Sequence, residues 1–424
     1  MPASFPRSPL PRFFRAKQFL PDQHVGDVRS DVREKLISGG LKERVKPGAQ
    51  IGISAGSRGI GRFIELLAGI ADAVKQAGGE PFIFPAMGSH GGATAEGQVE
   101  ILKRLGVGEE SVGAPIRATM ETVPLGEAGN GAVAHVDKLA YEADGIIVLG
   151  RTKTHPESTG PIASGLLKMC TIGLGKQSGA QQAHNHGLWD SVRSVPRVQL
   201  SLAKILFGVA VVENGYRQPA VIEVVPANYE AFIEADLRLL DVAKTFLTRI
   251  PFELLDVLIV DEIGKTISGG GMDPNIIGKW RNSDAPHIPD YRRIVALSLT
   301  DESLGNGLGI GMADFTTQRF AKAYDPAVTY INLLTAQEPG SNTREGPLPL
   351  ALDSDREAIE VALYSALADG EPRLCRVANT GNLGKFWASE ALLNEVKLNP
   401  KLEQISEPGF LPFDERGNLF EAHP

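Results

Sequence analysis

The sequence alternates short, continuous apolar runs with amphipathic segments of helical period, and this alternation restricts the fold more than any other feature. Two of the runs span residues 145–149 and 207–212, and a third expected strand at 255–261 contains the apolar run 257–260. An apolar run without polar alternation is typical of a strand that is buried on both faces, as in a parallel sheet covered by helices. Strands that alternate with helices predict right-handed crossover connections and an α/β fold.

The same patterns place further elements along the chain. The expected additional strands are residues 51–54, 81–85, 293–298 and 329–334, and the expected helices are residues 59–76, 95–105, 229–247 and 353–367.

The length of the chain indicates more than one core. At 424 residues it exceeds the size at which a single core usually stops growing. We therefore expect two domains, each with a parallel or mixed sheet flanked by helices, and an active site in the cleft between them. The expected division gives an N-terminal cofactor-binding and catalytic α/β domain at 1–254 and a C-terminal α/β domain at 255–424, whose last helices could pack back on the first domain.

Charge and composition exclude several classes of partner. The formal net charge is -8 and no long basic run is present, so we expect neither nucleic acid nor a membrane as a partner. Two cysteines, Cys170 and Cys375, indicate no disulfide framework and fit a reducing compartment. The first 15 residues lack the continuous apolar stretch of a secretory signal. We expect a cytoplasmic protein, and a homo-oligomer is compatible with these features.

Three of the eight histidines lie in or just after turns rich in glycine, serine or threonine that begin where apolar runs end. They are His90 in Gly88-Ser89-His90-Gly91-Gly92, His155 in Thr152-Lys153-Thr154-His155, and His184. In an α/β protein such turns line the crevice at the carboxyl ends of the strands, where ligands bind. A neutral imidazole can exchange protons near neutral pH or bind a metal. His90 also has an ordinary explanation, which is capping the following helix or hydrogen bonding within its loop, and the His184-Asn185-His186 pattern is not specific for metal.

Three basic residues accompany these histidines. Lys168 lies in the apolar run Leu166-Leu167-Lys168-Met169-Cys170. Partial burial of its amine would favour the neutral, nucleophilic form, although a lysine can also keep its head in water. Lys176 follows a glycine turn and is a second candidate base. Arg58 lies in Gly56-Ser57-Arg58-Gly59-Ile60-Gly61, where a guanidinium could hold a carboxylate or phosphate, or could simply be a surface arginine.

The glycine run around Arg58 is similar to the dinucleotide loop of short-chain dehydrogenases, but the likeness is incomplete. The glycine spacing is one residue short, and no tyrosine is followed four positions later by lysine. A plain turn or an anion site other than a nicotinamide site is therefore the favoured interpretation.

In order and spacing, Arg58, the Gly88-Ser89-His90 loop, His155, Lys168 and His184 resemble the nickel-pincer-nucleotide lactate racemase family, over about residues 51–281. The resemblance implies that His90 and His155 are the two catalytic acid/bases, that Lys168 is the covalent anchor of the cofactor, and that His184 ligates its nickel. The cofactor is a nickel complex of a pyridinium bisthiocarboxylic acid mononucleotide, made by separate maturation enzymes. The further candidates for cofactor binding are Gly88, Ser89, Arg58 and Lys176.

Two departures from the family pattern concern the substrate. The aspartate of the family's Asp-His-Thr-Arg motif is replaced by Ala55, and its Gln-x-x-Lys motif is absent. The nearest counterpart supplies Lys279 and Arg281, which we expect to bind substrate together with Arg58. A small 2-hydroxy acid, not necessarily lactate, is the expected substrate.

The implied reaction is racemisation or epimerisation by reversible hydride transfer to the cofactor, with the two histidines exchanging the hydroxyl proton. The sequence contains no zinc signature, so a metal with one or two protein ligands and a bound organic ligand fits best. Two alternatives stay open. One is a nicotinamide-dependent oxidoreductase, and the other is a non-catalytic nucleotide- or ligand-binding relic of the same scaffold.

Overall fold

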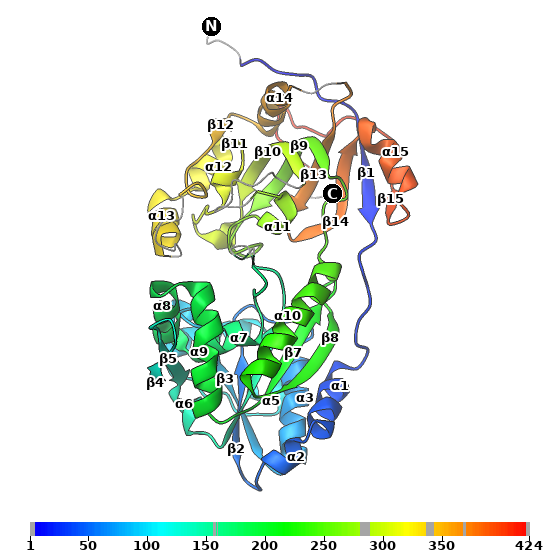
Figure 1. The fold of residues 1–424 in the computed structure, drawn as a ribbon. Helices are drawn as coiled ribbons and strands as arrows, with labels where there is room; N and C mark the ends of the chain where they lie inside the picture. Colours follow the sequence, from blue (N-terminus) through cyan, green and yellow to red (C-terminus); the bar gives the residue numbers. More distant parts are fainter. Residues whose placement is uncertain are drawn as a thin grey trace. The chain divides into compact units, whose positions relative to one another are not determined.

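The chain folds into two compact units, which are treated separately below (Figure 1). The computed structural model describes residues 5–155, 158, 160–279, 289–335, 343–367 and 370–420. One unit, here the continuous unit, is Pro21–Leu247, and the other, here the split unit, combines Met1–Leu20 with Thr248–Pro424. The expected N-terminal domain began at residue 1 and ended at 254, whereas the first 20 residues group with the C-terminal part of the chain.

The continuous unit is built on a five-stranded sheet in the order β3-β2-β6-β7-β8. The first four strands are parallel and β8 is antiparallel to β7. A separate antiparallel pair, β4-β5, stands beside this sheet. The strands are β2 (Gln50–Ala55), β3 (Glu80–Pro85), β4 (Thr122–Glu127), β5 (Val133–Asp137), β6 (Gly145–Arg151), β7 (Ile205–Glu213) and β8 (Pro219–Pro226). The helices are α1 (Val28–Ser38), α2 (Leu41–Arg44), α3 (Phe63–Gln76), α4 (Ala95–Arg104), α5 (Glu109–Val112), α6 (Lys138–Glu142), α7 (Leu166–Lys168), α8 (Lys176–Asn185), α9 (Leu188–Leu202) and α10 (Tyr229–Phe246), with the 3-10 turn η1 (Gly91–Ala93) and the π-helical turn η2 (Met169–Leu174).

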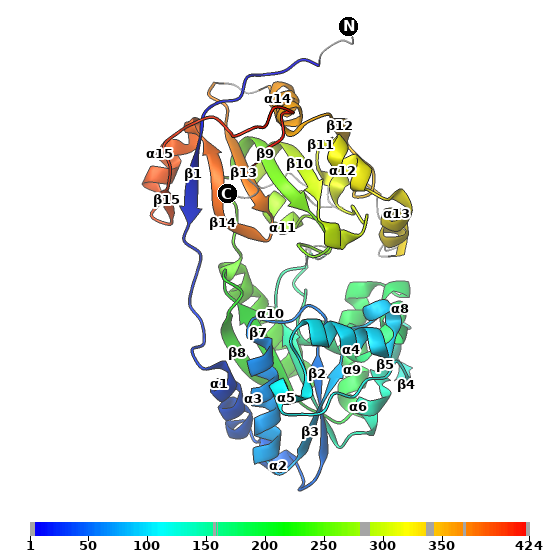
Figure 2. The ribbon, with the colours of Figure 1, turned by 180° about the vertical axis from the view of Figure 1, so that it is seen from behind.

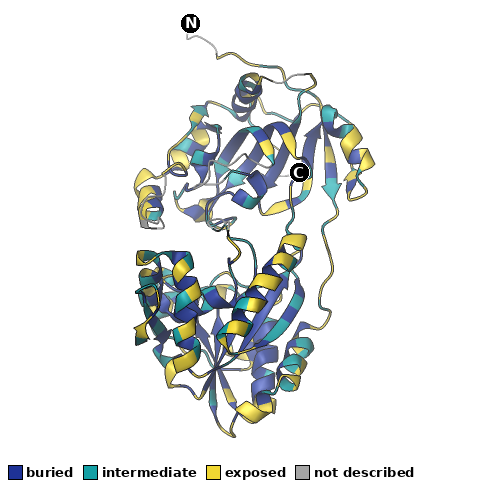
Figure 3. Cartoon of the chain, in the orientation of Figure 1, coloured by how far each residue is buried: buried dark blue, intermediate teal, exposed yellow. Residues whose placement is uncertain are grey.

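Helices cover both faces of this sheet, which explains its continuous apolar strands. In β6, Ile147 and Leu149 join the core under α1 and α3, whereas Ile146 and Val148 join the core under α7, α9 and α10. Successive side chains of a strand point to opposite faces, so every residue of such a strand must be apolar. Helices α9 and α10 lie in front of the sheet in Figure 1, and α1 and α3 lie in front of it in Figure 2. Figure 3 shows the buried strands and the exposed outer sides of the helices.

The split unit holds an eight-stranded sheet in the order β12-β11-β10-β9-β13-β14-β1-β15. Its strands from β12 to β13 are parallel, and β14, β1 and β15 add on as antiparallel neighbours. The strands are β1 (Phe13–Gln18), β9 (Leu254–Ile263), β10 (Asp290–Leu299), β11 (Phe315–Thr317), β12 (Leu350–Leu352), β13 (Leu374–Asn379), β14 (Asn382–Ser389) and β15 (Leu402–Gln404). The helices are α11 (Pro274–Ile277), α12 (Gln318–Ala323), α13 (Pro326–Thr335), α14 (Asp355–Ala366) and α15 (Leu393–Leu398), with the 3-10 turns η3 (Asp301–Ser303), η4 (Ile310–Met312) and η5 (Glu390–Leu392).

The expected α/β class with mixed sheets flanked by helices is confirmed, but the strand expected at 329–334 is wrong, because these residues lie in α13. The Asp325 carboxylate accepts hydrogen bonds from the backbone N–H groups of Ala327 and Val328, at 2.8 and 3.2 Å. Proline is favoured at a helix start, so Pro326 and Asp325 together begin a helix where the apolar run alone is ambiguous. Within the described residues, no helix has both the length and the apolar character needed to cross a membrane.

Candidate functional site

The candidate residues of the continuous unit follow the carboxyl ends of three neighbouring parallel strands. The loop after β2 carries Arg58, the loop after β3 carries His90, and the segment after β6 carries His155. Because β3 lies on one side of β2 and β6 on the other, the chain reverses its strand order between β2 and β6. A crevice forms at such a switch point, and it is the usual ligand site of an open α/β sheet.

His155 and Lys168 share one aromatic neighbour, Trp189 at the start of α9. The His155 and Trp189 rings meet edge to face, with their centroids 5.2 Å apart. The Lys168 Nζ lies 5.2 Å from the centroid of the same ring. Aromatic edge contacts and cation–π contacts of this kind fix the two side chains relative to each other. Trp189 gives no functional signal in the sequence, because a tryptophan in an amphipathic helix is ordinarily a packing residue.

The surroundings of His155 disfavour its protonated form. Burial lowers its pKa well below the ordinary value of 6.5, and the positive charges of Lys168, Lys153 and Arg58, followed by His184, lower it further. These groups come from the loops after β2 and β6, from α7 and from α8. The fold thus brings four of the predicted residues, Arg58, His155, Lys168 and His184, within electrostatic reach of one another. A neutral imidazole is the form that can accept a proton.

The Lys168 segment is fixed by a buried carboxylate on α10. The Asp236 Oδ1 and Oδ2 atoms accept the backbone N–H groups of Leu166 and Leu167 at 2.8 and 2.9 Å. Gly165 is required here, because a Cβ at this position would lie 2.3 Å from Asp236 Oδ1. Burial raises the pKa of Asp236 to about 6. The chain then enters the π-helical turn η2 directly after Lys168, and such turns are frequent at functional sites. Asp236 gave no sequence signal, because an acid on a long amphipathic helix is usually solvated.

His90 stands on an exposed loop that contacts the Arg58 loop. Its Nδ1 is hydrogen-bonded to the Ser57 hydroxyl, next to Arg58. Gly88 has a φ of +60°, and a Cβ there would lie 2.9 Å from an Ile172 methyl group, so glycine is required for this turn. Ser89 is exposed in the same turn. The Arg58 loop is therefore the link between the two histidines, because Ser57 holds His90 and the Arg58 charge acts on His155.

Lys176 has a structural position rather than the expected cofactor-facing one. Its side chain is fully buried and its Nζ donates to the Pro85 carbonyl and to Gln98 Oε1, at 2.8 and 2.7 Å. It also lies 3.3 Å from Asp137 Oδ2. Gln98 in turn donates through Nε2 to the carbonyls of Gly88 and His90, at 2.9 and 3.2 Å. Lys176 therefore acts through Gln98 on the backbone of the His90 loop.

The remaining predicted residues belong to the split unit. Lys279 forms an ion pair with Asp314 at 3.1 Å, and Asp314 Oδ2 also accepts the backbone N–H of Ile294 at 2.7 Å. Arg281 lies outside the described residues.

The two glycine-rich loops at 269–271 and 307–311 pack backbone to backbone. An ideal Cβ on Gly309 would lie 1.8 Å from the Gly270 carbonyl oxygen, and one on Gly271 would lie 2.0 Å from that of Leu308. Close packing of the two loops accounts for these glycines.

The described residues do not form a complete set of metal ligands at this centre. Among the residues that the structure describes, no group of three or more histidine, cysteine, aspartate or glutamate side chains is placed to hold an ion. His184 is half-buried on α8 and is a single candidate ligand. A bound organic group that supplies the other donors fits this arrangement.

The fold and the gathered residues define an α/β protein with a candidate centre at the carboxyl ends of parallel strands. Residues 54–277, more than half of the 424, match the family model described as "Domain of unknown function (DUF362)", and the chain belongs to this family. All the predicted site residues except Lys279 and Arg281 lie inside the matched range.

The solved structures that are similar to this chain include the following two. One is a Thermotoga maritima protein solved by the Northeast Structural Genomics Consortium, with 13% identity, a TM-score of 0.47, and coverage of 77% of this chain and 88% of that one. The other is the lactate racemase apoprotein from Thermoanaerobacterium thermosaccharolyticum, with 13% identity, a TM-score of 0.46, and coverage of 92% of this chain and 96% of that one. No curated protein matches the sequence.

Proposed function

We propose that this chain is a racemase or epimerase of a small 2-hydroxy acid, and that it works with a nickel-pincer nucleotide attached to Lys168. The observation that carries the proposal is that His155 and Lys168 both contact the Trp189 ring. Arg58 and His184 are also close enough to lower the pKa of His155. These residues are far apart in sequence, and a purely structural role would not require two histidines, a lysine and an arginine at one strand edge.

The residues fit the cofactor that the proposal requires. Lys168 would hold it covalently, and His184 would be the one protein ligand of its nickel. The absence of a cluster of three metal-binding side chains in the described part of the chain agrees with a metal whose other donors belong to the organic group. When bound, the cofactor supplies an electrophilic acceptor for hydride, which no amino-acid side chain provides.

The side chains of the centre would bind the substrate carboxylate and exchange its hydroxyl proton. His155 is neutral near physiological pH and can take the hydroxyl proton of the substrate, and His90 can do the same for the other stereoisomer. The Ser57 hydroxyl orients the His90 ring through Nδ1. The Arg58 guanidinium is suited to hold the substrate carboxylate with two parallel hydrogen bonds.

The first experiment measures the attached mass and the metal. Protein produced together with the cofactor-maturation enzymes is expected to carry a nucleotide-sized adduct that maps to Lys168, with about one nickel per chain. Lys168→Ala should lose the adduct. The control is Lys204→Ala, which should keep it. Lys204 directly precedes β7, and its Nζ donates to the Ala143 carbonyl. No adduct and no nickel despite active maturation enzymes would contradict the proposal.

The second experiment measures turnover. His90→Ala and His155→Ala are each expected to lower the interconversion of 2-hydroxy-acid stereoisomers by about 10²–10⁴-fold while nickel content is unchanged, because only proton exchange is removed. A rate near that of the unmodified protein in either variant would show that the histidine assignment is wrong. Net oxidation of substrate with bound NAD(H) would instead identify a nicotinamide-dependent oxidoreductase, and a bound nucleotide without any turnover would identify a binding relic.

A further inference from the structure

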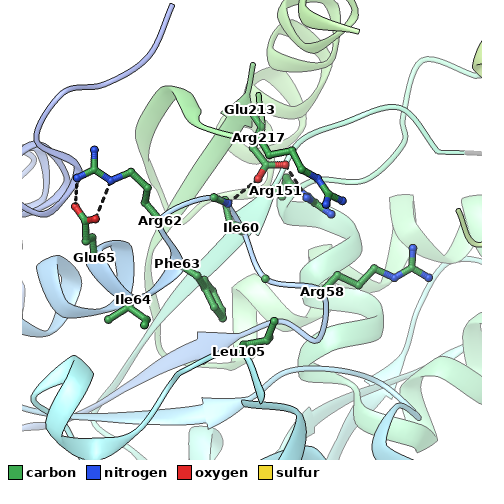
Figure 4. Close-up of a pocket in the computed structure, with 12 residues that line it drawn as sticks. Arg58, Ile60, Arg62, Phe63, Ile64, Glu65, Leu105, Arg151, Glu213 and Arg217 are labelled. Carbon is green, nitrogen blue, oxygen red and sulfur yellow. Dashed lines mark hydrogen bonds and ion pairs between the residues drawn. The ribbon is translucent and has the colours of Figure 1, made fainter. Parts of the chain in front are cut away.

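Glu213 is the last residue of β7, and its side chain connects two other segments of the continuous unit. Figure 4 shows Glu213 between Arg151 and the glycine loop that joins β2 to α3. Its Oε2 atom accepts a hydrogen bond from Arg151 Nη1 at 2.6 Å, and its Oε1 atom accepts the backbone N–H of Gly61, also at 2.6 Å. Arg151 ends β6, which lies between β2 and β7 in the sheet. One carboxylate therefore joins the ends of β6 and β7 to the loop after β2.

The two contacts of Glu213 are largely shielded from water. The side chains of Glu213 and Arg151 are only 12% and 15% exposed. A charged hydrogen bond is stronger where water is mostly excluded. Each oxygen atom of the carboxylate has its own donor, so a side chain with a single acceptor oxygen, such as glutamine, can satisfy only one of the two donors in these positions.

The glycine loop depends on such contacts for its position. Three of the residues between β2 and α3 are glycines, which have little conformational preference of their own. Gly61 also packs on the turn between β7 and β8, because an ideal Cβ on it would lie 1.7 Å from the Arg217 carbonyl oxygen. Asn214 shapes this turn by accepting the backbone N–H of Gln218 at 2.9 Å. The end of β7 thus supplies both the carboxylate and the turn that contact Gly61.

Both segments that Glu213 joins lead to residues of the candidate centre. Ser57 and Arg58 belong to the glycine loop, and His155 lies four positions beyond the end of β6. The Ser57 hydroxyl is hydrogen-bonded to His90, and the charge of Arg58 acts on His155. A shift of the loop relative to β6 would therefore move these groups relative to one another.

We propose that Glu213 is a positioning residue of the candidate centre, which sets the distance between the glycine loop and the end of β6 and thereby places Arg58 and the Ser57–His90 contact. The kinetic consequence of this role rests on the proposed racemase, because it requires Arg58 to bind the substrate carboxylate. The contacts of Glu213 themselves exist without cofactor or substrate. Displacement of a reacting or binding group by about 1 Å can lower a rate about 100-fold, so a contact that fixes two loops matters for activity.

The first measurement uses the full chain without cofactor. In Glu213→Gln, hydrogen exchange of the backbone amides at residues 57–61 is expected to rise about tenfold, because one hydrogen bond to a charged group is lost. The NMR resonances of the His90 ring should also shift, because Ser57 moves with the loop. Exchange in β2 and β6 should stay unchanged, which separates local loosening from a loss of overall stability.

The control is Glu223→Gln. Glu223 on β8 is paired with Arg238 at 2.6 and 2.7 Å, so this variant makes the same charge change and breaks an ion pair in the same unit. It should leave the exchange at residues 57–61 and the His90 resonances unchanged.

Two variants of Arg151 test the same contact from its other end. Arg151→Gln should also raise the exchange at residues 57–61, because the Glu213 carboxylate loses the partner that orients it. Arg151→Lys keeps the positive charge and should raise the exchange less. Thermal melting shows which variants are folded, and the two Arg151 variants decide the question if Glu213→Gln does not fold.

Unchanged exchange at residues 57–61 in Glu213→Gln, an equal change in Glu223→Gln, or a rise that extends equally over β2 and β6 would each overturn the proposal. In protein that carries the cofactor, Glu213→Gln is expected to raise KM for the 2-hydroxy acid about tenfold and to change kcat less, because Arg58 binds the substrate carboxylate. An unchanged KM would also overturn the role of Glu213. If the unmodified protein has no turnover while the exchange and the His90 resonances respond as expected, the role of Glu213 is supported and the proposed racemase is contradicted.

Discussion

His155 combines partial burial with a cluster of neighbouring positive charges, and both favour its neutral form. The folded protein then binds fewer protons at this residue than the unfolded chain does. Stability contributed by this difference is present above the ordinary pKa of 6.5 and is lost as the pH falls from 6.5 through the lower folded value. The same arrangement keeps the imidazole ready to accept a proton at neutral pH.

The pKa of His155 should rise when its strongest charged neighbour is removed. Lys168→Met is expected to raise the pKa, because Lys168 makes the largest charge contribution to its depression. The pKa should stay below 6.5, because burial is the larger cause and is retained. NMR titration of the imidazole resonances measures this directly. Lys204→Met should not move it, and an unchanged pKa in Lys168→Met would show that the two side chains are not neighbours in solution.

At the scale of elements, Lys176 ties α8 to β3, α4 and β5 through Pro85, Gln98 and Asp137. Removing one partner of a buried ion pair leaves an uncompensated charge, so Lys176→Met is expected to lower the free energy of unfolding by about 3–5 kcal/mol. Adding Asp137→Asn should restore part of the loss, because both charges are then gone while the amide can still cap α6. Denaturant unfolding measures both variants.

The exposed Lys244→Met is the control for this series and should change the unfolding free energy by about 0.5 kcal/mol or less. Hydrogen exchange of the backbone amides at residues 88–90 should increase in Lys176→Met, because Gln98 loses the partner that orients it. A double variant less stable than Lys176→Met would contradict the ion-pair interpretation.

The strands and helices that could be predicted from the sequence are those whose hydrophobic pattern depends only on their own residues. The buried strands β6, β7 and β9 and the helices α10 and α14 follow from their own periodicity. The roles of Lys176, Asp236 and Trp189 depend on partners from distant segments, and no local pattern records them. Likewise, His90, His155 and Lys168 follow strand or turn signals and could be named as candidates from the sequence. The pairing of Lys279 with Asp314 could not, because it depends on the folded split unit.

At the scale of the whole molecule, the chain passes from one unit to the other twice, after residue 20 and after residue 247. The first passage exists because β1 lies between β14 and β15 and pairs with both. Its residues Phe13, Phe14 and Ala16 are fully buried in the split unit. The N-terminal segment is therefore an internal part of the C-terminal sheet, which the expected division at residue 254 did not anticipate.

Weakening β1 should consequently destabilise the split unit and spare the continuous unit. Phe13→Ala is expected to lower the unfolding free energy of the split unit by about 3–5 kcal/mol, because Phe13 packs in the core with Val257, Ile259 and Trp387. Hydrogen–deuterium exchange should then increase in β14 and β15 but not in β2 and β6. Phe5→Ala removes an exposed phenylalanine, 57% accessible, and should leave exchange unchanged. Faster exchange in β2 and β6 together with β14 would mean that the two units unfold as one cooperative body, and the assignment of β1 to a separate unit would fail.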